Sequence, residues 1–453
     1  MYSDVRISKL KFSYHNAAAA AAAAQPLMPG ERRNFHPRTR EEHQAMYDAQ
    51  NLIPEYASLV SKVPIVGTWD DHDCGINDAD KYFQHKEERQ ELHLNFLHVP
   101  KNDPRRTRKG VYASHIVGGN IKVILLDVRY HRDPWSWHPG GMPTGTTAEA
   151  EAEAEAEAEA RPEARPEARP DMLGAEQWTW LEQELSQNLV NHQNIEVTLI
   201  VSGFQILPIV YSAASKHETW HHFKKSRQRL FNLMSTSATP VVLLSGDVHY
   251  AEMSESFCYE SVEAGEGGEG GKGGEGGEKM SPPRRLLEFT SSGLTHAWAG
   301  PWNWPKPVPV ALLFRVAWWA WSKIGVNPWR VEAYPGLNFG MIELIEQKLI
   351  MRAIGVDNQT KFETVVSLDE LLGGSGSGSR SAPRRGRVVC HPRNGVPTSY
   401  EISMAKCLFV SVLLLLILLL VVPFLWCCCC CCKLTVLGGG GDKKQQQHKI
   451  KEK

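Results

Sequence analysis

The 453-residue sequence lacks an excess of charge of either sign. Its 50 lysine and arginine residues balance 51 aspartate and glutamate residues, which gives a net charge of -1 at pH 7. A protein that binds nucleic acid through the phosphate backbone usually carries a basic excess on its binding face. The charge balance therefore gives no indication of a nucleic-acid partner, and we expect none.

The sequence also lacks a cysteine framework and a serine-hydrolase motif. Six of its ten cysteines form one block at 427–432, and the other four are scattered. This spacing predicts no disulfide set and leaves the redox compartment open. The chain contains no Gly-x-Ser-x-Gly elbow, so a serine hydrolase has no support. No signal peptide begins at Met1.

Several stretches have too little apolar surface to order themselves. They are the eight alanines at 17–24, the Glu-Ala and Arg-Pro repeats at 149–170, a Gly- and Glu-rich segment within 261–280, and a Gly-Ser stretch at 373–379. We interpret the first three as loop insertions, which surface loops tolerate at low cost. The Gly-Ser stretch lies within a predicted linker at 366–406.

One hydrophobic run near the carboxyl end, Cys407–Trp426, contains 20 residues and no charge. It is long enough to cross a bilayer as a helix. We therefore predict a single-pass membrane protein that contacts the lipid bilayer here, followed by a cysteine-rich and basic tail at 427–453. Basic residues flank the run on both sides and leave its orientation open. The preceding domain is expected to be lumenal or extracellular if a signal peptide lies upstream, and otherwise cytosolic and tail-anchored.

Between the insertions, apolar strand-like segments alternate with helical patterns. The predicted strands begin "VPIVGTWDDHD", "IKVILLDVRYHRD", "VTLIVSGFQILP", "PVVLLSGDVHY" and "LLEFTSSGLTH". The segments "GAEQWTWLEQELSQNL" and "SRQRLFNLM" have apolar residues at helical spacing. "FGMIELIEQKLIMRAIGV" predicts a β-hairpin. This alternation predicts an α/β fold with a parallel or mixed sheet.

Polar residues follow the predicted strands at their carboxyl ends, where open α/β sheets place their binding crevice. These residues are Asp71, His72, Asp127, Arg129, Asp247, His249 and His296. Burying unpaired carboxylates is costly, and multivalent cations relieve that cost. Two such cations can also clamp a phosphate and activate a water for in-line attack. The sequence therefore predicts a metal site at this edge of the sheet.

The segments "GTWDDHDCGINDADK", "VILLDVRYHRD", "LGAEQWTWLEQEL", "SGFQILP", "SGDVHYAE" and "SSGLTH" follow one another in the chain. In this order they resemble the PhoD-like metallophosphatases, the alkaline phosphatase D family of the calcineurin-like phosphoesterases. The resemblance covers residues 1–365 apart from the insertions. It implies a four-layer αββα sandwich and a phosphatase or phosphodiesterase that uses Fe³⁺ and Ca²⁺. Its expected substrate is a phosphate ester, including a lipid-borne one.

The resemblance also implies roles for particular residues. Asp71 is expected to bind metal, and His72 to protonate the leaving group. Asp247 and His249 match the late metal-binding motif of the family. Arg129 suits phosphate binding, because its planar guanidinium can meet two phosphate oxygens. Additional site residues without an assigned task are Asp70, Asn77, Asp127, His296 and Asp78.

One motif of the family is incomplete in this sequence. The family begins with a Gly-Asp-x-x-Tyr motif whose aspartate binds metal, whereas this chain begins "MYSD". Tyr2 and Asp4 match the end of that motif, and Tyr2 is expected to be a metal ligand. We favour the interpretation that the sequence is a piece of a longer enzyme. The alternative is a catalytically inactive, membrane-anchored pseudophosphatase or binding protein.

A competing motif is "HETWH", which spans His217 to His221. It fits the His-Glu-x-x-His pattern of zinc peptidases, in which two histidines bind zinc and the glutamate, here Glu218, acts as a base. Short patterns of this kind arise by chance across many sequences. We therefore treat a zinc peptidase as a remote alternative.

Overall fold

The computed structural model describes most of the predicted phosphatase region and little of the chain beyond it. The described residues are 9–12, 39–134, 170–186, 194–209, 218–262, 279–280, 283–294, 297, 327–373, 388–395, and scattered positions from 398 to 414. The chain divides into two compact units, residues 1–304 with 327–397 and residues 305–326 with 398–453. All elements described below belong to the first unit.

Among the described residues, the larger sheet has nine strands, and its central path runs β13-β6-β8-β5-β4-β3-β2. Four adjacent strands of this path, β3, β4, β5 and β8, are parallel. Their β-branched and aliphatic residues are almost all buried, as is usual for a parallel sheet covered on both faces. The bounds are β2 Ala113–Val117, β3 Ile121–Leu125, β4 Val197–Val201, β5 Val241–Ser245, β6 Ala251–Val262, β7 Lys279–Met280, β8 Arg284–Ser291, β9 Arg330–Tyr334 and β13 Val388–Pro392.

The second sheet is antiparallel, with the order β1-β10-β11-β12. Its strands are β1 Lys9–Phe12, β10 Asn338–Ile345, β11 Lys348–Gly355 and β12 Thr360–Ser367. The predicted hairpin is confirmed as β10–β11. Glu346 and Gln347 form its two-residue turn with φ of 48° and 62°. Positive φ at both central residues is the geometry that suits the twist of a tight hairpin.

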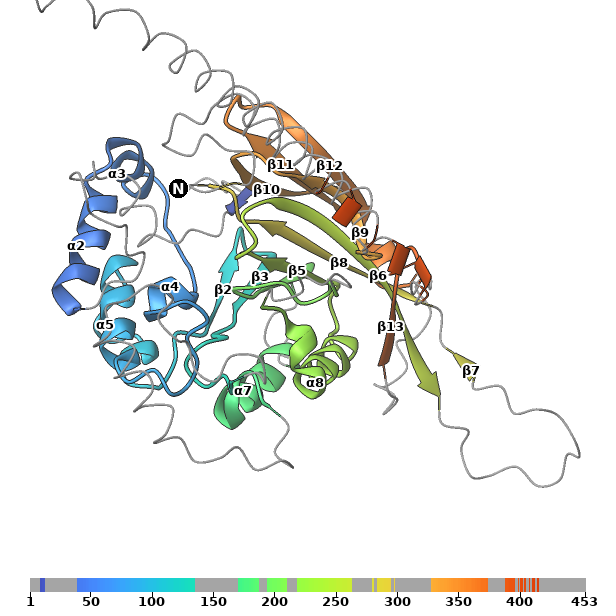
Figure 1. Cartoon of the computed structure of the whole chain (residues 1–453), viewed down its shortest axis with the longest axis horizontal. Helices are drawn as coiled ribbons and strands as arrows, with labels where there is room; N and C mark the ends of the chain where they lie inside the picture. The colour runs from blue at the N-terminus through green and yellow to red at the C-terminus, as the bar shows by residue number, and fades with distance from the viewer. Residues whose placement is uncertain are drawn as a thin grey trace, which may run out of the picture. The chain divides into compact units, whose positions relative to one another are not determined.

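The two sheets share one core, and helices cover the other face of the larger sheet (Figure 1). The core between the sheets includes Leu199, Leu244 and Phe289 from one sheet and Ile342 and Met351 from the other. Two helices, α7 Gly174–Ser186 and α8 Lys224–Ser235, pack their apolar residues on the opposite face, among them Trp178, Leu181, Leu230 and Phe231. The α/β class and both predicted helices are confirmed. The fourth layer of the predicted sandwich stays a prediction.

The strand expected at "VPIVGTWDDHD" is wrong. Residues 64–70 have no regular secondary structure and pair with no described strand, and Val63 and Val66 are 44% and 41% exposed. The segment is attached through a side chain instead, because the Thr68 hydroxyl donates to the carbonyl of Leu126 at 2.7 Å. A run of β-branched residues therefore does not establish membership of the sheet here.

The predicted single-pass membrane location is also corrected. No helix among the described residues is long and apolar enough to cross a membrane. Within the run predicted to span the bilayer, only Cys407, Val410, Ser411 and Leu414 are described. The uncharged composition indicated a span, but the described part of the structure contains none.

The predicted linker at 366–406 contains an edge strand of the large sheet and a disulfide. Strand β13 pairs with β6, so that Cys390 lies opposite Cys258 and bonds to it across 132 residues of sequence. The cysteine spacing indicated no disulfide framework and could not relate these two cysteines, because sheet register brings them together. A short helix, α10 Leu368–Leu371, precedes this strand.

We expect Cys390→Ser to lower the free energy of unfolding by about 2–4 kcal/mol, because the disulfide closes a long loop and restricts the unfolded chain. Urea titrations of the oxidised wild type, the reduced wild type and the variant measure this effect. Reduction should lower the wild-type stability to that of the variant and leave the variant unchanged. Equal stabilities of the oxidised wild type and the variant would contradict the expectation.

A helical group lies beside the sheets (Figure 1). It contains two buried histidines. It consists of α2 Arg40–Asn51, α3 Pro54–Val60, α4 Asp71–Cys74 and α5 Lys86–Phe96. His43 on α2 and His93 on α5 are buried, and neither Nε2 atom has a hydrogen-bond partner among the described atoms. Burial, followed by nearby arginine charges, lowers the pKa of both imidazoles to about 3.

We expect these two histidines to make the folded protein less stable in acid. An unfolded histidine takes up its proton near pH 6.5, whereas the folded ones do so only near pH 3, so stability is lost as pH falls from 6.5 towards 3. At pH 5 the expected loss is on the order of 2 kcal/mol for each histidine. Urea unfolding of the wild type and His43→Phe at pH 7 and pH 5 tests this. The variant should lose less stability than the wild type, and equal losses would contradict the interpretation.

Candidate metal centre

The candidate site forms where two parallel strands end near the start of a short helix. Asp127 and Arg129 follow β3, and Asp247 follows β5, as the sequence predicted. Asp71 begins α4, and Asp70 immediately precedes it in extended conformation. Asp247 has a φ of 73°, a left-handed conformation that aspartate and asparagine tolerate better than most residues. The fold therefore brings carboxylates from distant parts of the sequence to one edge of the sheet.

Three carboxylates face one another closely enough to hold a cation. Ligand atoms of Asp70, Asp71 and Asp247 all lie within 4.8 Å of one another. Oδ2 of Asp70 is buried and has no hydrogen-bond partner among the described atoms. Burial and the neighbouring carboxylates raise the pKa of Asp70 and Asp247 well above the usual range. An oxygen-preferring cation relieves this repulsion, so the residues fit a metal ion.

Asp71 differs from its two neighbours because backbone N–H groups and nearby positive charges stabilise its ionised form. Its Oδ1 accepts from the N–H of His72 at 2.7 Å, and its Oδ2 accepts from the N–H of Asp78 at 3.2 Å. Burial alone would raise its pKa, but His72, Arg129 and these N–H groups together lower it to about 2. The imidazole Nε2 of His72 lies 3.9 Å from Oδ2 of Asp71. Asp71 is therefore ionised at neutral pH.

Arg129 is fully buried, and its guanidinium group contacts two carboxylates. Its Nε and Nη2 contact Oδ1 of Asp70 at 2.6 and 2.5 Å, and its Nη2 contacts Oε2 of Glu218 at 2.6 Å. These pairs engage Nε and Nη2 of the guanidinium group, and the expected role in phosphate binding stays a prediction. Arg132, also buried, pairs with Oε1 of Glu218 at 2.7 Å. The structure thus gives Arg129 a positioning contact with a carboxylate of the site.

The other predicted site residues fall in three groups. Asp127 is buried and accepts from the N–H groups of Val111, Arg129 and Tyr130, each at 2.9 Å, so it stabilises the turn after β3. His249 and Asn77 are exposed, and the N–H of His249 donates to the Ser292 hydroxyl at 3.0 Å. Tyr2, Asp4 and His296 lie outside the described residues.

The described part of the peptidase motif does not form the expected helix. Residues Trp220–His222 form a 3-10 helix with Thr219 as its N-cap, whereas the peptidase motif requires histidines one α-helical turn apart. Glu218 is buried in ion pairs with the two arginines instead of facing a metal. His217 lies outside the described residues. The described geometry therefore gives the peptidase alternative no support.

Sequence reasoning missed the role of two residues of this network, Glu218 and Arg132, and gave Asp78 no task. Both Arg132 and Asp78 lie inside motifs quoted for the resemblance, so position in a motif was the available signal. Burial and the charge of Glu218 raise the pKa of Asp78 to about 6. Glu218 had drawn notice only as a peptidase base. Its partners are 86 and 89 residues away in sequence, too far for any spacing rule to relate them.

Comparison with known proteins adds a family assignment. The sequence model of the family described as PhoD-like phosphatase matches residues 12–267, more than half of the chain. A solved structure titled "Structure of PhoD" is similar with a TM-score of 0.46 and 14% sequence identity, and the alignment covers 91% of this chain and 78% of that chain. No curated protein matches the sequence.

Proposed function

Because the chain belongs to the PhoD-like phosphatase family and is a phosphoric ester hydrolase, we propose that it hydrolyses phosphate mono- or diesters with bound metal ions. The observation that carries this proposal is the group of Asp70, Asp71 and Asp247, whose ligand atoms lie within 4.8 Å of one another. Carboxylate oxygens are the ligands that hard cations prefer.

The metal ions, when bound, would neutralise phosphate oxygens and supply an activated water. The protein residues have separate tasks in this proposal. Asp70, Asp71 and Asp247 hold the cations, and His249 completes the set from the same edge of the sheet. His72 is half-buried beside Asp71, where an imidazole can give a proton to the leaving oxygen. Asp71 orients that imidazole and remains ionised.

The identity of the metals is part of the proposal. Similarity to the family favours Fe³⁺ together with Ca²⁺. The described carboxylates are compatible with both ions, because oxygen ligands suit hard cations. Elemental analysis of the purified protein tests this assignment. Stoichiometric zinc, with neither iron nor calcium, would contradict it.

Release of p-nitrophenol from p-nitrophenyl phosphate and from its bis ester tests the activity. We expect turnover by the metal-loaded protein, loss of turnover in excess chelator, and recovery when the metal is returned. The relative rates on the two esters distinguish monoester from diester preference. A fully metal-loaded protein without turnover on either ester would support the alternative of an inactive binding protein.

A further inference from the structure

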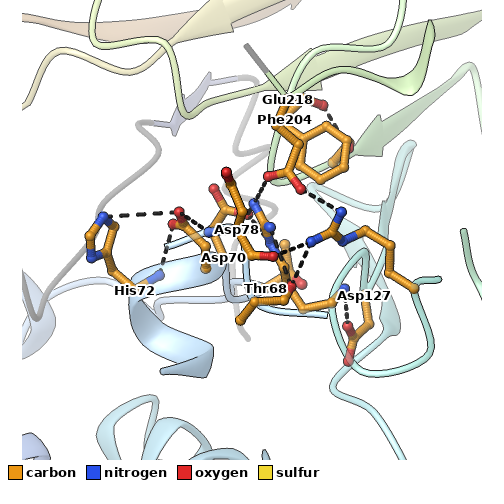
Figure 2. A network of polar contacts seen from close by, with 12 residues as sticks. Thr68, Asp70, His72, Asp78, Asp127, Phe204 and Glu218 are labelled. Atoms are coloured by element: carbon orange, nitrogen blue, oxygen red, sulfur yellow. Dashed lines mark hydrogen bonds and ion pairs between the residues drawn. The ribbon is translucent and has the colours of Figure 1, made fainter. Parts of the chain in front are cut away.

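Glu218 forms ion pairs with two buried arginines, Arg129 and Arg132, and these arginines contact the segment Asp70–Ala79. Its Oε2 lies 2.6 Å from Nη2 of Arg129, and its Oε1 lies 2.7 Å from Nη1 of Arg132. The side chains of all three residues are at most 2% exposed. Buried ion pairs are screened little by solvent, so these contacts constrain one another strongly. Figure 2 shows Glu218 directed into the same network as Asp70 and Asp78.

The two arginines hold both ends of the segment that carries Asp71 and His72. At one end, Arg129 binds Oδ1 of Asp70 through Nε and Nη2. At the other end, Nη2 of Arg132 donates to the carbonyl of Ala79 at 2.9 Å and also to that of Asp78. The segment has no sheet partner among the described strands. These side-chain contacts therefore take over the positioning that a β-ladder would give.

Glu218 also limits how fully Arg129 neutralises Asp70. Arg129 contacts only Oδ1 of Asp70, while its Nη2 is shared with Glu218. Oδ2 of Asp70 stays without a hydrogen-bond partner among the described atoms, and Asp70 offers one carboxylate oxygen to the group that it forms with Asp71 and Asp247. Loss of the Glu218 charge would let Arg129 pair with Asp70 alone. The electrostatic attraction of the site for a cation would then decrease.

We propose that Glu218 is a positioning residue of the metal site, acting through Arg129 and Arg132 to fix Asp70–Ala79 and to keep one oxygen of Asp70 directed at the cation. This role rests on the proposed function for its catalytic consequence but not for its effect on metal binding. It also explains why a glutamate of a peptidase-like motif is buried on two arginines.

Glu255 provides a matched control. It is 1% exposed and pairs with two arginines, Arg285 and Arg393, but it lies on β6, and among the described residues its partners make no ion pair with the three carboxylates. Glu218→Gln and Glu255→Gln therefore each remove the charge of a buried carboxylate that pairs with two arginines, although the arginines of Glu255 are 23% and 45% exposed. Both are expected to lower the melting temperature. Only the first is expected to alter the site.

The decisive measurement is a titration of the metal-free proteins with Mn²⁺ alone. The electron paramagnetic resonance signal of free Mn²⁺ reports how much of the ion is bound. We expect Glu218→Gln to weaken Mn²⁺ binding at least tenfold and Glu255→Gln to change it less than twofold. Glu218→Asp, which keeps the charge, should recover part of the affinity and supplies the comparison if Glu218→Gln does not fold. At saturating Mn²⁺, kcat of Glu218→Gln should stay at least tenfold below wild type with a similar KM.

Two outcomes would overturn the proposal. One is wild-type Mn²⁺ affinity in Glu218→Gln, or in Glu218→Asp and Glu218→Ala if the glutamine variant does not fold. The other is an equal loss of affinity in Glu255→Gln, which would indicate general destabilisation. If the wild type binds Mn²⁺ but hydrolyses no ester, the proposed function fails while the binding comparison still decides the role of Glu218.

Discussion

Asp71→Asn is expected to lower kcat/KM for a phosphate ester by more than about 100-fold. Loss of a residue that only holds a metal ligand in place already lowers metal affinity or activity about 10- to 100-fold, and Asp71 is itself a proposed ligand. The substitution removes a charge that is present at neutral pH, since the pKa of Asp71 is lowered to about 2. It also places an NH₂ group where the two oxygens now accept from the N–H groups of His72 and Asp78. Steady-state kinetics at saturating metal measure the loss.

Asp73→Asn is the control for this prediction. Asp73 lies on the same short helix and is buried, but its carboxylate accepts from the Tyr47 hydroxyl at 3.3 Å and does not belong to the group of three. Burial raises its pKa to about 7. An asparagine there should leave kcat/KM within a few-fold of wild type. Equal losses in the two variants would mean that helix geometry, not the Asp71 charge, sets the activity.

The sequence predicted those elements whose pattern lies within one continuous segment of the chain. Helix α7 was recognisable because Trp178, Leu181 and Leu185 recur at helical spacing, and all three are buried. The β10–β11 hairpin was recognisable because its strands adjoin in sequence. In contrast, β13 is a five-residue strand that follows a glycine- and arginine-rich stretch. Its pairing with β6 depends on a distant partner, which no local pattern reveals.

The candidate site could likewise be predicted only in part. Asp71 and Asp247 could be predicted because they follow apolar runs within motifs of the family. The ion pairs of Arg129 could not, because its partners Asp70 and Glu218 lie 59 and 89 residues away. From sequence alone, Arg129 suited a phosphate as well as a carboxylate, since both accept two hydrogen bonds from a guanidinium group. The structure shows Arg129 fully buried with two carboxylates beside it, and its role in phosphate binding stays a prediction.

Asp247→Asn is expected to change stability in opposite directions with and without metal. In the metal-free protein, burial and the charges of Asp70, Asp71 and Glu218 raise the pKa of Asp247, so its ionised form is unfavourable in the fold. Asparagine removes that repulsion and tolerates the φ of 73° at this position. We therefore expect the metal-free variant to be more stable than the metal-free wild type by about 1 kcal/mol.

With metal bound, the same substitution removes a ligand. A cation present at 1,000 times its dissociation constant stabilises the fold by about 4 kcal/mol, and a 100-fold loss of affinity reduces this to about 1.4 kcal/mol. The variant should then be less stable than wild type, so the two proteins exchange rank between chelator and saturating metal. Thermal unfolding in both conditions measures this exchange.

Asp127→Asn distinguishes relief of repulsion from a general effect of removing a buried carboxylate. Asp127 accepts from three backbone N–H groups and stands outside the group of three carboxylates. Its substitution should destabilise the protein equally in chelator and in metal, because it breaks a turn and not a ligand set. If Asp247→Asn behaved in the same way, the three carboxylates would not be held together by a cation, and the metal-dependent part of the proposed function would be wrong.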